Sequence, residues 1–188
     1  MDSPNMPTTT GNTPFVMRLI GAMALDPITY EEVEADHGAN GQALLVVLLS
    51  SFGAGIGARG IGSGSLRSMV FISSVSLIAW VAWAFLTLQI GGRLMPEPQT
   101  RVDVGELMRT IGFSAAPGIL RVFGIVPGAS IAAFALTAVW MLAAMVVAVR
   151  SALDYKTIAR AIVVCVIGWT LAIGIAVGFG LFFGSTLS

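Results

Sequence analysis

Apolar and polar positions alternate in long blocks along this chain. Five long stretches are nearly free of charge, and short polar links separate them. The stretches cover residues 41–58, 68–92, 109–126, 129–149 and 161–185. About 20 apolar residues are enough to cross a hydrocarbon core about 30 Å thick, so blocks of this length predict membrane-spanning helices. The pattern therefore predicts an all-α, polytopic membrane protein with five transmembrane helices.

The first 40 residues follow a different pattern. Residues 1–12 are polar and rich in Pro, Thr and Asn, which predicts a disordered tail. Residues 13–40 hold a short apolar segment that contains Arg18, and then an acidic segment that opens with Asp26-Pro27, a helix cap followed by proline. Neither is long enough to span a bilayer. Both are predicted to be interfacial helices, with Arg18 toward the lipid headgroups.

Two alternatives apply to this N-terminal part. Ala22-Met23-Ala24 resembles a signal-peptide cleavage site, but no positive charge precedes the apolar segment and Arg18 interrupts it. Glu32, Asp36 and His37 would suit a divalent cation, but one histidine with two carboxylates is a weak metal signature. A solvated acidic helix is the simpler interpretation, with Glu32 and Asp36 repelling each other on one face because they are four residues apart.

The third block, 109–126, is the shortest and most irregular. Pro117 lies in its middle, and Pro127 with Gly128 ends it. It also contains Arg121, the one charge that falls clearly inside an apolar block. Two interpretations of Arg121 are open. It anchors an anionic lipid or a partner's carboxylate, or it snorkels to the nearby interface.

Small residues recur on the predicted spans at spacings that allow close contact between helices. In the first and fifth spans we select as candidate packing positions Gly53, Gly57, Gly174, Gly178, Gly180 and Gly184. Glycine lets two backbones approach closely in a membrane, so these positions predict tight helix–helix contact.

Composition agrees with a membrane protein and limits the chemistry. Hydrophobic residues make up 56% of the chain and charged residues 11%, against about 25% charged in soluble domains. Zero net charge gives no argument for nucleic acid. The single cysteine, Cys165, and the single histidine, His37, leave the spans without a disulfide, a cysteine metal site or a histidine for haem or chlorophyll. We therefore expect no cofactor and no enzymatic activity.

Basic residues set the predicted orientation. With five spans, one side carries Arg18, Arg93, Arg101, Arg109, Arg150, Lys156 and Arg160, and the other carries Arg59, Arg67 and Arg121. The positive-inside rule then places the N-terminus in the cytoplasm and the C-terminus outside, although all ten acidic residues share the more basic side. A re-entrant third segment would leave four spans and divide the basic residues five to five. Five spans are therefore preferred.

Several short motifs, spread from about Phe15 to Gly184, are similar to one known family. They are Leu25-Asp26-Pro27, Gly112-Phe113-Ser114 followed by Pro117 and Ile125-Val126-Pro127, Trp140, and Ala159-Arg160-Ala161. In this pattern the chain resembles the Yip family, the Ypt/Rab-GTPase-interacting five-span membrane proteins. Its short tail and Ala/Gly/Val-rich spans look like those of a bacterial member, which implies a bacterial inner-membrane location. The resemblance implies a non-enzymatic role in membrane organisation.

We therefore expect a scaffold or accessory subunit of a larger membrane assembly, such as a redox, photosynthetic or transport complex. Its partners would be membrane lipids and other membrane subunits rather than nucleic acid. The candidate contact residues are Gly112, Phe113, Ser114, Pro117 and Arg121. One alternative is a membrane-shaping or lipid-binding protein. The other is a small transporter or channel, because broken helices line transport sites.

Overall fold

The computed structural model describes residues 13–61, 66–98, 100 and 103–184; the side chains of residues 61, 68, 71, 72, 76 and 172–184 lie outside this description. Within these ranges every regular element is a helix and no strand occurs. The predicted all-α class is therefore confirmed for the described chain.

The helical elements include four of 18 residues or more and several shorter ones. In chain order they are α1 (Phe15–Met23), α2 (Pro27–Ala35), η1 (His37–Ala39), α3 (Asn40–Gly57), η2 (Ala58–Ile61), α4 (Leu66–Gln89), η3 (Ile90–Leu94), α5 (Val104–Ser114), η4 (Ala116–Ile125), α6 (Ser130–Ala152) and α7 (Ile158–Gly184). The elements η1, η2 and η4 are 3-10 helices, and η3 is a π-helical extension of α4.

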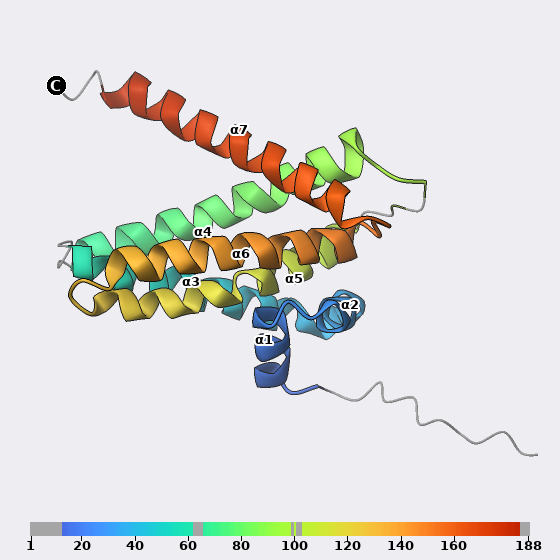
Figure 1. Ribbon diagram of the computed structural model, residues 1–188, viewed down its shortest axis with the longest axis horizontal. Coiled ribbons are helices and arrows are strands. Elements are labelled where there is room, and N and C mark those ends of the chain that lie inside the picture. The colour runs from blue at the N-terminus through green and yellow to red at the C-terminus, as the bar shows by residue number, and fades with distance from the viewer. Residues whose placement is uncertain (1–12, 62–65, 99, 101–102, 185–188) are drawn as a thin grey trace, which may run out of the picture.

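Figure 1 shows α3, α4, α6 and the α5–η4 segment lying side by side as a bundle. Successive segments run in opposite directions, so their termini gather at two ends. At one end, here named the polar end, α2 meets the start of α5 and the end of α6. α7 contacts α6, α4 and η3, and diverges from the bundle toward the C-terminus (Figure 1). α1 and α2 lie across the bundle, near the polar end (Figure 1).

Among the described residues, three helical stretches are long and apolar enough to cross a membrane: His37–Gly60, Ser73–Leu94 and Ser130–Ala152. A shorter apolar stretch, Ile158–Leu171, covers the first half of α7. In the most apolar part of the first stretch 56% of the residues are buried, against 17% in that of α6. α3 is therefore the centre of the bundle, whereas α6 turns most of its apolar surface outward, as a lipid-facing helix does.

The third segment starts earlier than the predicted 109–126 and contains a break. α5 begins at Val104, where the Asp103 carboxylate accepts a hydrogen bond from the Glu106 N–H (3.3 Å). The α-helix stops at Ser114, and η4 then continues with Pro117 in its first turn. Proline has no N–H and collides with the preceding turn of an α-helix, so the chain continues here as a tighter 3-10 helix.

η4 packs against α3 with almost no side chains between the two backbones. A Cβ added to Gly53 would lie 2.9 Å from the carbonyl oxygen of Ile119, and one added to Gly57 would collide with the carbonyl oxygen of Arg121. Only glycine permits this approach, because any side chain would force the two helices apart.

Candidate functional site: an acidic pocket at the polar end

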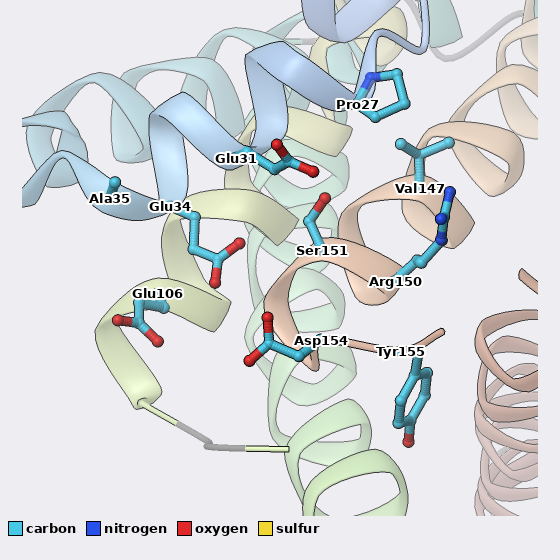
Figure 2. Close-up of a pocket in the computed structure, with 10 residues that line it drawn as sticks. All are labelled: Pro27, Glu31, Glu34, Ala35, Glu106, Val147, Arg150, Ser151, Asp154 and Tyr155. Atoms are coloured by element: carbon cyan, nitrogen blue, oxygen red, sulfur yellow. The ribbon is translucent and has the colours of Figure 1, made fainter. Parts of the chain in front are cut away.

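α2 brings acidic side chains to the polar end. The Asp26 carboxylate caps its first backbone N–H groups, and proline follows as the first helical residue. Tyr30 and Val33 are fully buried, and the Tyr30 hydroxyl donates to the carbonyl oxygen of Ala22 (3.2 Å). This buried face fixes the rotation of the helix, so that Glu31 and Glu34 turn toward α5 and α6 (Figure 2).

Arg18 connects α1 to α2. Its side chain is only 4% exposed and forms ion pairs with Glu32 (2.9 Å) and Asp36 (2.7 Å), while Nη1 also donates to Gln42 Oε1 (3.1 Å). The predicted headgroup orientation of Arg18 is therefore wrong, because its guanidinium points inward. The repulsion predicted between Glu32 and Asp36 is offset, because both carboxylates pair with one guanidinium. Hydrogen bonding from Arg18 lowers the pKa of Asp36.

Arg109 connects α5 to α2 and α3. At 1% exposure it is the largest fully buried side chain of the described residues. Nε donates to the carbonyl oxygens of Val33 and Glu34 (both 3.2 Å), Nη2 donates to Glu34 as well, and Nη1 donates to Asn40 Oδ1 (3.2 Å). These carbonyls belong to the last turn of α2, where intrahelical donors run out and the helix dipole is negative. Arg109 thus fixes the C-terminal end of α2.

An open pocket of about 480 Å³ lies between α2, α5 and the end of α6 (Figure 2). α2 contributes Glu31 and Glu34, α5 contributes Glu106, and the link that follows α6 contributes Asp154. Among the described residues that line it, Arg150 is the only basic one. Carboxylates from three separate parts of the chain therefore surround one space, and the described lining supplies one cationic side chain.

The pKa of Glu34 is changed by burial and by the neighbouring carboxylates. Burial, and then the negative charges of Asp154, Glu106 and Glu31, raise its pKa to about 7. The positive charge of Arg109 opposes this rise but is the smallest contribution. Since an unperturbed glutamate has a pKa of about 4.3, Glu34 is unusual in being close to half protonated at neutral pH.

The link between α6 and α7 forms one wall of the pocket. The Tyr155 hydroxyl lies 2.9 Å from the carbonyl oxygens of Gly91 and Met95 and donates to them, which ties this link to η3. Asp154, just before it, has a φ of 51°, a left-handed conformation that aspartate tolerates better than most residues. The position of the Asp154 carboxylate in the pocket thus depends on a specific turn.

An open pocket with this lining suits a positively charged ligand group. A lysine ammonium or an arginine guanidinium forms its strongest hydrogen bonds with carboxylates. The geometry does not favour a metal ion, because no group of three or more His, Cys, Asp and Glu residues in the described ranges could hold one. In particular, Glu32 and Asp36 of the alternative metal site are bonded to Arg18 instead.

The residues predicted to contact lipid or a partner lie elsewhere. Gly112, Phe113, Ser114 and Pro117 are buried inside the bundle. Phe113 packs edge-on against Phe15, with 6.3 Å between the ring centroids. None of the four lines the acidic pocket.

Arg121 is half-buried on η4, away from the pocket. Its Nε donates to Thr137 Oγ1 (3.3 Å), and its guanidinium carbon lies 5.5 Å from the centre of the Phe134 ring. The guanidinium thus rests on α6. Of the candidate packing glycines, Gly53 and Gly57 face η4 as described above. Gly174, Gly178, Gly180 and Gly184 lie in the part of α7 whose surroundings are outside the description.

The pocket residues Glu34, Glu106 and Asp154 and the buried Arg109 are not among the site residues predicted from the sequence. One signal was available, since Glu31 and Glu34 are three apart and share a helix face. Comparison of the chain with protein-family models, with curated proteins and with solved structures gives no match.

Proposed function

We propose that this chain is a non-enzymatic accessory or scaffold subunit of a larger membrane assembly, and that its acidic pocket holds a basic segment of a partner. The observation that carries the proposal is the convergence of Glu31, Glu34, Glu106 and Asp154 around one open space. A lysine or arginine side chain of a partner would relieve the repulsion among these carboxylates.

The scaffold that presents the pocket supports this role. Arg18 and Arg109 are buried, and their donors are taken up by acceptors of α2, by Asp36 directly after it, and by Asn40 and Gln42 at the start of α3. They hold α2 in place through Glu32, Asp36, the backbone of α2 and the start of α3, and not through the side chains of Glu31 or Glu34. A fixed acidic surface of this kind favours a complementary partner and disfavours an acidic one.

The lining also favours binding over catalysis. It contains carboxylates, an arginine, a serine and a tyrosine, but no histidine, cysteine or lysine. Ser151 is the only lining residue with an aliphatic hydroxyl, and no histidine accompanies it to act as a general base. A set of this kind holds a cation more readily than it transfers a group.

The proposal includes a five-span topology with the polar end in the cytoplasm of a bacterial cell. The alternating directions of α3, α4, α5–η4, α6 and α7 support it, because each would cross the bilayer once (Figure 1). The larger share of basic residues on the polar-end side supports the orientation. The resemblance to the Yip family belongs to the same proposal.

The test is purification of the full chain from native membranes in a mild detergent, followed by mass spectrometry and an absorption spectrum of the same fraction. We expect a stoichiometric membrane partner with the wild type. Glu31→Gln combined with Glu34→Gln and Asp154→Asn should lose that partner, because all three carboxylates lose their charge while keeping their shape.

Asp103→Asn is the matched control, since it removes one negative charge outside the pocket lining and keeps an oxygen that can cap α5. A photo-crosslinking residue at Glu31 should attach to a Lys- or Arg-rich segment of the partner. Retention of the partner by the triple variant would contradict the proposal.

A further inference from the structure

α1 has two sharply different faces. Arg18, its only ionisable residue, points inward and is 4% exposed. Val16, Met17 and Ile20 are 60%, 57% and 54% exposed, and they share the other face because Ile20 comes four residues after Val16 and three after Met17. The outward surface of α1 therefore carries no charge, unlike the charged face of a helix that lies among headgroups.

Contacts at both ends of α1 hold it some distance from the polar end of the bundle, toward the middle of α6. At its C-terminal end, the carbonyl oxygen of Met23 accepts a hydrogen bond from Trp140 Nε1 (2.7 Å). Trp140 is near the middle of α6, which runs from Ser130 to Ala152, and so lies about 18 Å from the polar end of that helix at about 1.5 Å per residue. At its N-terminal end, Phe15 packs on the buried Phe113. α1 thus lies across the bundle, between the polar end and the middle of the bundle (Figure 1).

The C-terminal end of α1 is bonded to a long apolar helix whose side chains near the bond are exposed. Leu136 and Val139, one turn and one residue before Trp140, are 70% and 71% exposed on α6. α6 is long and apolar enough to span, so this part of its surface faces lipid in a bilayer. Because Trp140 bonds directly to the end of α1, α1 lies at the same level of the bundle as these exposed residues of α6.

We propose that α1 lies inside the acyl-chain region of the leaflet on the polar-end side, where lipid chains cover Val16, Met17 and Ile20, and that it does not cross the membrane. It acts as a wedge in one leaflet. A helix of nine residues is about 14 Å long and about 10 Å wide, so it enlarges the protein in this leaflet alone. The protein therefore prefers membranes that are convex on the polar-end side. This inference does not rest on the acidic pocket.

The depth of α1 is tested with the full chain in a Cys165→Ala background, since Cys165 is the single native cysteine. Met17→Cys, Val139→Cys and Ile28→Cys are spin-labelled separately and placed in phosphatidylcholine vesicles. Collisions with oxygen report lipid, and collisions with a water-soluble nickel chelate report water. The label at position 17 should match the one at 139, with high oxygen and low nickel accessibility, whereas the label at 28, which is 73% exposed on α2, should be open to nickel.

Two results would overturn the assignment. A label at position 17 that is as open to nickel as the one at 28 would place α1 in water. A label protected from both reagents would mean that protein, such as a second copy or a partner, covers the face instead of lipid.

The wedge itself is tested in giant vesicles with the polar end oriented outward. Membrane tubes pulled from these vesicles should be enriched in the wild type relative to the flat membrane. The triple variant Val16→Ser, Met17→Ser and Ile20→Ser should lose the enrichment, although Arg18 and its partners are untouched. Val139→Ser is the control, because it changes a lipid-facing residue of α6 outside α1. Equal partition of the wild type between tube and flat membrane would refute the wedge.

Discussion

The two halves of the third segment carry one arginine each, and their surroundings differ. Arg109, in the α5 half, is 1% exposed and donates to two carbonyl groups of α2 and to the side chain of Asn40. Arg121, in the η4 half, is half-buried, donates to the Thr137 hydroxyl and lies over the ring of Phe134. One guanidinium organises three elements, whereas the other rests on a single helix.

The difference shows that a charge within an apolar run is not by itself the important one. A buried guanidinium is tolerated when fixed acceptors surround it, and the C-terminal carbonyls of α2 supply them for Arg109. The η4 half is held in another way, by backbone contact with Gly53 and Gly57 of α3. Side-chain hydrogen bonds hold the α5 half in place. The η4 half is held by close backbone packing, which the two glycines of α3 permit because they have no side chain.

The largest effect is expected for Arg109→Ala. It leaves the carbonyls of Val33 and Glu34 and the Asn40 amide without their buried donor, at a cost of about 3 kcal/mol or more in the free energy of unfolding. Arg109→Lys should lose less, because an ammonium keeps the charge but cannot reach all three acceptors with a flat fork of donors. Unfolding of the purified variants in detergent measures both. A loss no greater than that of Arg121→Ala would remove the contrast between the two halves.

The η4 half is tested by Gly57→Ala. The added methyl group meets the carbonyl oxygen of Arg121, so overpacking should reduce stability by about 1–3 kcal/mol. Gly41→Ala is the matched control in the same helix, because nothing lies within 4 Å of its added Cβ. There alanine should be neutral or should stabilise α3 by up to about 1 kcal/mol. Equal effects at the two glycines would show that α3 and η4 have room to separate.

Hydropathy alone places much of the bundle. α3, α4 and α6 begin at Asn40, Leu66 and Ser130, close to the starts of the blocks 41–58, 68–92 and 129–149. In a bilayer an apolar run must satisfy its backbone within itself, so its length and its ends define the helix. Pro117 likewise marks the irregular third segment, but the sequence does not specify that the chain continues as a 3-10 helix.

The polar contacts could not be predicted in the same way. Arg109 meets residues about 75 positions earlier in the chain, and Asp154 reaches the pocket from beyond α6. No local pattern connects such positions. The pattern of α1 taken alone predicts a headgroup position for Arg18, but its partners are Glu32 on the next helix and Asp36 directly after that helix. Periodicity defines single helices, but it does not show which helix supplies a partner.

A smaller effect is expected from pH at Glu34, which lies on α2, the helix whose C-terminal end Arg109 fixes. Its pKa is raised to about 7 in the folded chain, so its contribution to stability is complete below its ordinary pKa and is lost as pH rises through about 7. Because the side chain is half-exposed, solvent screens much of the effect, and we expect the melting temperature to fall by about 2–4 °C, which corresponds to about 1 kcal/mol.

Thermal unfolding in detergent at pH 5 and pH 8 measures this change. Glu34→Gln should flatten the dependence, because glutamine does not titrate, and Asp103→Asn should leave it in place. A wild-type protein that is more stable at pH 8 than at pH 5, with the same slope in Glu34→Gln, would contradict the assignment of the effect to Glu34.

The smallest loss of stability is expected for Arg121→Ala. The variant loses one hydrogen bond to Thr137 and the contact with Phe134, each worth about 0.5–1.5 kcal/mol, but it also removes a charge from an apolar level of the bundle. These terms offset each other, so the net change should stay within about 1 kcal/mol. Native mass spectrometry of the same samples separates the two interpretations of this residue. If Arg121 anchors an anionic lipid, Arg121→Ala should lose bound phosphatidylglycerol while Arg121→Lys keeps it, and stability should hardly change. If lipid retention is equal in both variants, the guanidinium serves only its contact with α6, and the charge within the apolar run marks neither a binding site nor a structural centre.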